Sequence, residues 1–270
     1  MKKFLTLILA FVMGLACLSF AGCNSCSKKN ILIVYTEAGF APWEYKNPGS
    51  RDVVGVDMEI AKYIAIKYGY ELKIVDGSFD TIVAGIAEDN ALGIAGISWT
   101  AKRAEAVEFS DFYWGEAFQT VVYLKNSNPT LEDGVFLKSN FAGKNVVYQT
   151  GTTSHLTITE NEVAWGVAGK RSFQDVAVAL EEVKTDATLS TYLIVDSQVA
   201  AQLVAQNPAL GYATIEGVEA ESYGIVAKKG NKFLINQVNA ALAELLVEDE
   251  NGKNQIEKWY DMHSAIAPAD

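Results

Sequence analysis

The stretch SWTAKRAEAVEFSDFYW, residues 98–114, places a cation where a helix should begin. Thr100 belongs to the residue types that cap helices, so a helix is expected to start directly after it. Arg103 then falls in the first turn, where the helix dipole favours acids over cations. A cation is locally unfavourable there unless an anion joins it. We therefore expect Arg103 to bind a small carboxylate; a surface arginine is the simpler alternative.

The first 22 residues have the pattern of a signal peptide. Lys2 and Lys3 precede an apolar run that ends at small residues, as in secretory leaders. A membrane-spanning helix is the alternative, because the run approaches spanning length. The signal-peptide interpretation is favoured because small residues and a cysteine follow the run at once.

The sequence SFAGC, residues 19–23, is similar to the lipobox of bacterial lipoproteins, with Phe20 in place of the usual leucine. We expect cleavage after Gly22 and acylation of Cys23, which would anchor the protein to a membrane without spanning it. Residues 23–30 are polar and would form a tether. The expected location is therefore extracytoplasmic and lipid-anchored.

Composition excludes several kinds of site. The formal net charge is −11, and so acidic a chain is a poor binder of nucleic acid. Cys17 leaves with the signal peptide, and the other two cysteines lie in the tether region. The folded part therefore offers neither a disulfide nor a thiolate metal site, and we expect no metal and no cofactor.

Strands and helices alternate from residue 31 onward. Apolar residues recur every fourth position from Val56 to Tyr68, which predicts an amphipathic helix ending before Gly69. The order strand, helix, strand, helix, strand predicts an α/β fold with a parallel sheet and helices on both faces. The strands expected in this first unit are 31–36, 71–75 and 91–98, and the second helix is 78–89.

A second unit of the same type follows without a linker rich in proline, glycine or serine, so the chain is expected to cross between two lobes more than once. Two helices broken at residues 251–252 are expected to end the chain. The other expected strands are 118–125, 144–150, 190–195 and 223–229, and the other expected helices are 153–165, 173–183 and 196–207.

Three strands end in small polar turns that open helices, at residues 96–103, 148–155 and 194–201. In open α/β sheets the ligand crevice lies beyond the carboxyl ends of the strands, and helix N-termini offer free N–H donors to an anion. Arg103 adds a planar fork suited to a carboxylate, and Asp196 supplies the opposite charge from the other lobe. A ligand with both a carboxylate and an ammonium group would fit between them.

Seven segments resemble, in order, the amino-acid-binding proteins of ABC importers, extracellular solute-binding protein family 3 in its lipoprotein form. The type includes the histidine-, glutamine- and lysine/arginine/ornithine-binding proteins. The resemblance covers about residues 31–260. The segments are FAPWEYK (40–46), VVGVDMEIAKYIA (53–65), SFDTIVAGI (78–86), residues 98–114, QTGTTS (149–154), VDSQVAA (195–201) and YGIVAKKG (223–230).

The resemblance implies a periplasmic-binding-protein-like fold, with two α/β lobes joined by two crossover strands that close on an amino acid by a hinge motion. The crossovers would fall near residues 114–117 and 219–223. Lobe 1 would comprise residues 31–114 and 222–270, and lobe 2 residues 117–220. A monomer that delivers its ligand to a membrane permease is expected.

The resemblance also implies roles for nine residues. Arg103 would bind the α-carboxylate, helped by the backbone N–H groups of Ser98 and Thr153. Asp196 would take the α-ammonium together with the Ser98 hydroxyl and the Gly96 carbonyl. Phe40 and Phe79 would sandwich the ligand side chain, and Glu37 and Gln149 would touch its end.

Glu37 only accepts hydrogen bonds when ionised, which favours a ligand side chain that donates them: Lys, Arg, His or Gln. Two other functions stay open for the same fold. One is an enzyme similar to cyclohexadienyl dehydratase, for which the sequence shows no clearly positioned general acid. The other is a sensor module that signals through a partner.

Overall fold

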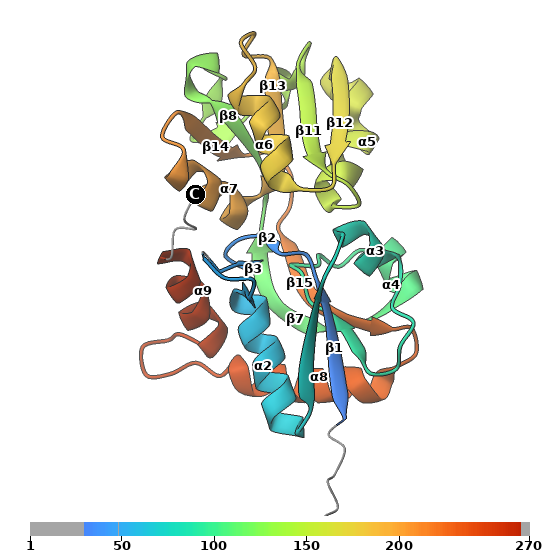
Figure 1. Ribbon diagram of the computed structural model, residues 1–270. Helices are drawn as coiled ribbons and strands as arrows, with labels where there is room; N and C mark the ends of the chain where they lie inside the picture. Colours follow the sequence, from blue (N-terminus) through green and yellow to red (C-terminus); the bar gives the residue numbers. More distant parts are fainter. Residues whose placement is uncertain (1–29, 48, 266–270) are drawn as a thin grey trace, which may run out of the picture. The chain divides into compact units, whose positions relative to one another are not determined.

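The structure, a computed structural model, describes residues 30–47 and 49–265 (Figure 1). The predicted signal peptide, Cys23 and the tether up to residue 29 lie outside the described residues. In the part that is described, no helix is both long and apolar enough to cross a membrane. The chain from Ile31 onward forms one compact unit built on two five-stranded sheets.

The first sheet has the strand order β5-β1-β6-β15-β7. β1, β5 and β6 are parallel, as predicted, whereas β15 is antiparallel to both of its neighbours. The expected strand 91–98 is shorter than predicted, because β6 ends at Gly93 and the chain then turns. The strands are β1 (Ile31–Thr36), β5 (Glu71–Asp76), β6 (Ala91–Gly93), β7 (Val107–Ala117) and β15 (Glu221–Lys228).

Helices cover both faces of the first sheet, because alternate residues of β1 enter two different cores. Leu32 and Val34 belong to the core that contains Ile60 and Ile64 of α2. Ile33 and Tyr35 pack instead against the core that contains Phe79 and Ile82 of α3. The helices of this part are α2 (Val56–Tyr68), α3 (Phe79–Ala84), α4 (Ala101–Ala106), α8 (Lys232–Leu245) and α9 (Gln255–Ala265).

The second sheet has the order β12-β11-β13-β8-β14, and it is mixed. β11, β12 and β13 are parallel, and β8 is antiparallel to β13 and β14. Its strands are β8 (Gln119–Leu124), β11 (Asn145–Gln149), β12 (Gly169–Phe173), β13 (Thr191–Asp196) and β14 (Leu210–Thr214), and its helices are α5 (Thr153–Trp165), α6 (Val176–Lys184) and α7 (Ser197–Gln206).

Short elements decorate both sheets. The segment 39–54 forms a small antiparallel sheet of β2 (Gly39–Phe40), β3 (Glu44–Lys46) and β4 (Val53–Val54). A second hairpin, β9 (Leu131–Glu132) and β10 (Val135–Phe136), lies between two 3₁₀ turns, Lys125–Ser127 and Lys138–Phe141.

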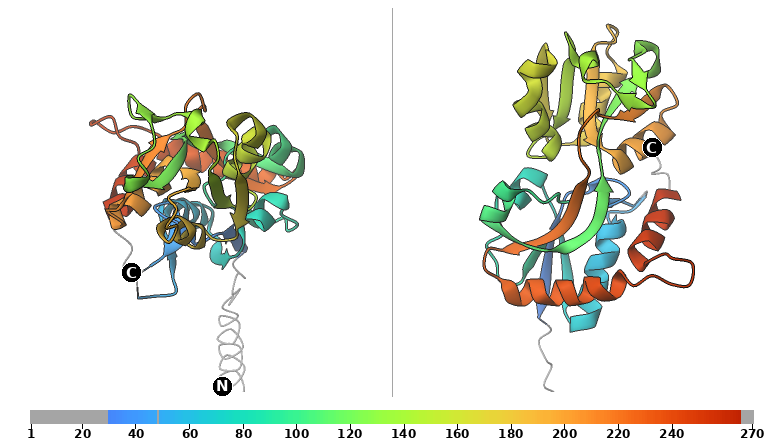
Figure 2. Two further views of the ribbon diagram at one scale, coloured as in Figure 1. Left: turned by 90° about the horizontal axis from the view of Figure 1, so that it is seen from above. Right: turned by 180° about the vertical axis from the view of Figure 1, so that it is seen from behind.

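The chain passes between the two sheets twice. β7 of the first sheet ends at Ala117 and β8 of the second begins at Gln119, and the chain returns from β14 into β15. β7 and β15 pair with each other, with register shifts between Glu221 and Val226 (Figure 2). We call the part built on the first sheet lobe 1 and the part built on the second sheet lobe 2. The lobe limits predicted from the sequence stay a prediction at the level of single residues.

Candidate ligand-binding site

One cavity collects eight of the nine predicted ligand-binding residues. Its lining comes from segments that follow strands of both sheets, as expected for the carboxyl ends of an open α/β sheet. Its volume is about 20 Å³, which is room for about one water molecule. The eight residues are Phe40, Phe79, Gly96, Ser98, Arg103, Gln149, Thr153 and Asp196, and the cavity also contacts Ala95, Thr152, Ser154, Val176, Ile194 and Val195.

Arg103 lies in the first turn of α4, whose start is fixed by Thr100. The Thr100 hydroxyl accepts a hydrogen bond from the Arg103 backbone N–H at 3.1 Å, which confirms the predicted cap. The guanidinium donates from Nη1 to the Ser98 carbonyl at 2.6 Å and from Nη2 to the Gly151 carbonyl at 2.9 Å. Since Ser98 belongs to lobe 1 and Gly151 to lobe 2, Arg103 bridges the two lobes.

The Arg103 guanidinium is buried and lies 5.3 Å from the centre of the Phe79 ring. Burial lowers its pKa to about 10, against the attraction of Glu221 and Asp196. Arg103 therefore stays charged at neutral pH. Two of its five N–H donors bind backbone carbonyls, which leaves the others for an anion in the cavity.

Asp196 ends β13 and precedes α7, and its side chain points to polar partners rather than capping its own helix. Oδ1 accepts from the Gln119 amide at 2.7 Å, and Oδ2 accepts from the Tyr223 hydroxyl of lobe 1. Burial, followed by repulsion from Glu221, raises the pKa of Asp196 to about 7, against the effect of these two hydrogen bonds and of Arg103. A positive group next to Asp196 would therefore stabilise the ionised form of its carboxyl.

A chain of polar side chains connects the start of α5 with Asp196. The Ser154 hydroxyl donates to the side-chain oxygen Oε1 of Gln119 at 2.6 Å, and the side-chain Nε2 of Gln119 donates to the Thr153 hydroxyl at 3.1 Å. Thr153 in turn donates to Glu221 at 2.7 Å. These bonds orient the cavity wall in lobe 2 and tie it to the crossover strand β15.

Glu37 is the predicted residue that does not line this cavity. It lies in an adjacent pocket with Lys46, Asp76 and Asp175, and the Gln149 amide forms a hydrogen bond with it. Burial raises the pKa of Glu37 to about 7, and the charges of Asp175 and Asp76 add to the shift. The pocket therefore joins carboxyl groups from both lobes next to the cavity.

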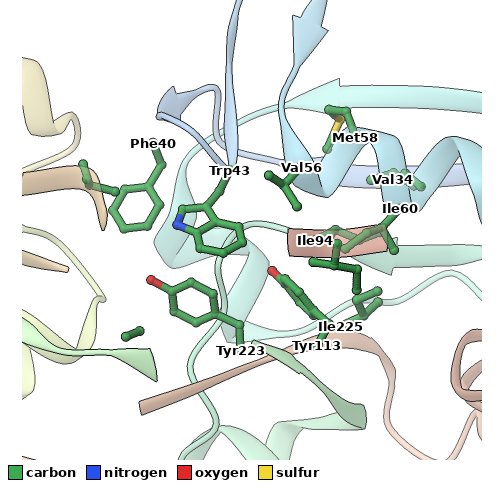
Figure 3. Close-up of a cluster of buried hydrophobic side chains, with 14 of the residues drawn as sticks. Val34, Phe40, Trp43, Val56, Met58, Ile60, Ile94, Tyr113, Tyr223 and Ile225 are labelled. Carbon is green, nitrogen blue, oxygen red and sulfur yellow. The ribbon is translucent and has the colours of Figure 1, made fainter. Parts of the chain in front are cut away.

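Phe40 forms the apolar wall of the cavity in lobe 1. Gly96 lies directly against it, because a Cβ at position 96 would be 3.1 Å from a Phe40 ring carbon. Behind Phe40, Trp43 packs edge-on against Tyr223 and Tyr113, with ring centres 5.1 and 6.2 Å away (Figure 3). The wall is thus supported by a rigid aromatic cluster.

Sequence reasoning missed three residues that shape the site: Gln119, Glu221 and Tyr223. Gln119 and Glu221 begin the strands β8 and β15, and Tyr223 lies within β15; no turn or charge pattern distinguishes these positions in the sequence. Thr152 and Ser154 were not predicted individually as site residues, although both lie in the small polar turn at residues 148–155 that was predicted to open a helix. Only the paired lobes bring these side chains to one place.

Residues 32–262 match the family model described as bacterial extracellular solute-binding proteins, family 3. The arginine-binding extracellular protein ArtP of Bacillus subtilis is 29% identical, over 96% of this chain and 98% of that protein. A probable histidine-binding protein of Campylobacter jejuni is 28% identical over 90% of this chain and 93% of its own.

Solved structures agree with this result. An ArgBP variant from T. maritima is 31% identical with a TM-score of 0.73, covering 86% of this chain and 96% of its own. The substrate-binding protein AbpA of Streptococcus pneumoniae, bound to L-arginine, is 25% identical with a TM-score of 0.76, covering 89% and 97%. The chain belongs to the bacterial extracellular solute-binding proteins of family 3.

Proposed function

We propose that this protein is the substrate-binding lipoprotein of an amino-acid ABC transporter. It captures a cationic L-amino acid, in the first place arginine, between its two lobes and delivers it to a membrane permease. The observation that carries the proposal is the pairing of opposite charges across one cavity: Arg103 on lobe 1 and Asp196 on lobe 2.

The charges match the two ends of an amino-acid backbone. A carboxylate can take the remaining guanidinium donors of Arg103, together with N–H groups at the start of α5. An ammonium group can bind Asp196, whose carboxylate is buried beside Glu221 and gains from a cation. In this arrangement Phe40 and Phe79 contact the ligand's carbon chain, as predicted from the sequence.

The adjacent pocket favours a cationic side chain. Glu37, Asp76 and Asp175 converge there, with Lys46 as the one basic residue lining it among those described. Lys46 already pairs with Asp76 at 3.1 Å. A guanidinium or ammonium at the end of a ligand side chain would therefore mainly relieve the repulsion between Glu37 and Asp175. Of the four ligands predicted from the sequence, Lys, Arg, His and Gln, we favour arginine, because relatives of this chain are named as binding it.

Binding requires the lobes to separate. The cavity volume of about 20 Å³ is far too small for an amino acid, and the bonds from Arg103 to Gly151 and from Thr153 to Glu221 cross between the lobes. Rotation about the crossovers at β7–β8 and β14–β15 would open the cavity and leave each sheet intact.

Membrane attachment, partner and lack of catalysis complete the proposal. A lipid on Cys23 would hold the protein outside the cell membrane, next to the permease that receives its ligand. We propose a monomer that binds without catalysing a reaction, in keeping with a family of solute-binding proteins.

A thermal-shift panel of the common amino acids tests the ligand class. Arginine well above its Kd should raise the melting temperature by about 5–10 °C. Arg103→Ala and Asp196→Ala should lower affinity by at least about 100-fold, because each leaves a buried charge without its partner. Lys102→Ala is the matched control on the same helix: it removes an exposed cation and should preserve affinity.

Three results of that panel would contradict the proposal. They are unchanged binding in both charge variants, a preference for glutamate, aspartate or aliphatic amino acids, and no response to any amino acid. Turnover of prephenate or arogenate by the purified protein would favour the dehydratase-like enzyme instead.

Glu37→Gln tests the origin of side-chain selectivity. The variant removes the negative charge while keeping the shape, so affinity for arginine and lysine should fall about tenfold or more, whereas affinity for glutamine should change less than about threefold. Calorimetric titration with each ligand measures both values. Glu88→Gln changes an exposed carboxyl outside the site and serves as control. Equal losses for arginine and glutamine would show that Glu37 does not read the side-chain charge.

Affinity should depend on pH through two carboxyls. Asp196 and Glu37 both have a pKa raised to about 7, so each holds a proton below pH 7 and must lose it to bind a cation. Affinity for arginine, which needs both carboxyls ionised, should therefore fall by up to about 100-fold per pH unit as pH drops from 8 to 5. Affinity for glutamine, which needs only Asp196 ionised, should fall by up to about tenfold per pH unit. Calorimetry across this range is the check. Constant affinity would mean that both carboxyls are ionised before the ligand arrives.

Cys23→Ala tests the membrane anchor. In cells that make the full chain, the membrane fraction should contain a mature protein whose N-terminal peptide carries the added acyl mass, and Cys23→Ala should abolish this modification. Cys26→Ala, three residues away, should leave it unchanged. An unmodified mature protein, or loss of acylation only in the Cys26 variant, would refute the assignment.

A further inference from the structure

Behind the cavity lies a buried carboxyl that is not among the residues lining it. Asp57, the second residue of α2, has no exposed surface. Its Oδ2 accepts from the Gly96 backbone N–H at 2.8 Å, and its Oδ1 accepts from the Tyr113 hydroxyl at 2.8 Å. Figure 3 shows the ring of Tyr113 beside Trp43 and below Val56, the first residue of α2.

The Gly96 backbone needs such a fixed partner. Gly96 lines the cavity with a φ of +50°, in the left-handed region that glycine adopts readily. Glycine can also reach other conformations at little cost, so its own backbone does not hold the peptide in place. The hydrogen bond from a buried carboxylate selects one orientation, with Phe40 packed directly against it.

A second buried carboxyl, Glu44 of β3, lies close enough to Asp57 for negative charges on both to repel each other. Asp57 lies in the first turn of α2, where the helix dipole favours a negative charge, and it accepts from two neutral donors. Glu44 has no such support: burial and the charge of Asp57 raise its pKa well above the usual value. The two hydrogen bonds to Asp57 and the helix dipole therefore place the negative charge of the pair on Asp57.

We propose that Asp57 is a positioning residue of the ligand site: its carboxylate, which also accepts from the Tyr113 hydroxyl, holds the Gly96 backbone in the orientation that receives the ligand's α-ammonium. This inference rests on the proposed function, since it assigns Asp57 a part in binding an amino acid. Asp57 acts through Gly96 and does not touch the ligand.

Asp57→Asn and Glu44→Gln form a matched pair of tests. Asparagine has a single acceptor oxygen, so either Gly96 or Tyr113 loses its partner, and affinity for arginine should fall about 10- to 100-fold. Glutamine at position 44 leaves the hydrogen bonds from Gly96 and Tyr113 to Asp57 in place, so affinity should change less than about threefold. Calorimetry measures affinity, and urea unfolding reports the stability of each variant.

The NMR signal of the Gly96 amide separates positioning from a general loss of structure. A carboxylate acceptor moves an amide proton downfield. The Gly96 signal should therefore shift upfield in Asp57→Asn and stay in place in Glu44→Gln, while amides of lobe 2 are unchanged in both. Equal affinity in the two variants, or an unmoved Gly96 signal in Asp57→Asn, would overturn the inference.

Two further measurements test the role of Asp57 if a variant does not fold or if no amino acid binds. If Asp57→Asn does not fold, carbon-13 titration of the wild-type carboxyls decides: a protonated Glu44 beside an ionised Asp57 at pH 7 supports it, and the reverse assignment overturns it. If the wild-type protein binds no amino acid, the proposed function fails, whereas the Gly96 signal still shows whether Asp57 holds this peptide.

Discussion

The structure depends on one buried cation held at the junction of two lobes. Arg103 donates to a carbonyl of its own lobe and to one of the facing lobe, and the carboxyls of Glu221 and Asp196 attract its charge. A buried charge is costly unless it is paired and hydrogen-bonded. The closed arrangement of the lobes meets this need with backbone carbonyls, and an amino-acid carboxylate can meet it better.

The cost of burying a charge also applies to the acidic residues Asp196 and Glu37. Asp196 and Glu37 are both buried, and the pKa of each is raised to about 7. Each is a poorly stabilised anion that a cation would stabilise. A ligand with one carboxylate and two cationic groups would satisfy Arg103, Asp196 and Glu37 together. Under the proposed function, these charges would select the ligand, and the aromatic wall would fit the shape of its carbon chain.

The α/β fold and most of the elements around the site could be predicted from local patterns, such as the threonine cap before Arg103, the strand end at Asp196 and the turns of small polar residues. Most of the predicted site residues came from the family resemblance; eight of them line one cavity, and their roles in binding stay a prediction. Prediction failed where position depends on pairing between distant segments. Nothing local reveals that β15 runs antiparallel, that Gln119 and Tyr223 both reach Asp196, or that Glu37 lies beside the cavity and not in it.

An experimental structure of the protein crystallised with L-arginine would test the pairing of Arg103 and Asp196 with a ligand most directly. We expect the α-carboxylate within hydrogen-bond distance of the Arg103 guanidinium, the α-ammonium on Asp196 and the ligand guanidinium near Glu37. An amino acid bound with its backbone ends reversed, or bound away from Arg103 and Asp196, would contradict this expectation.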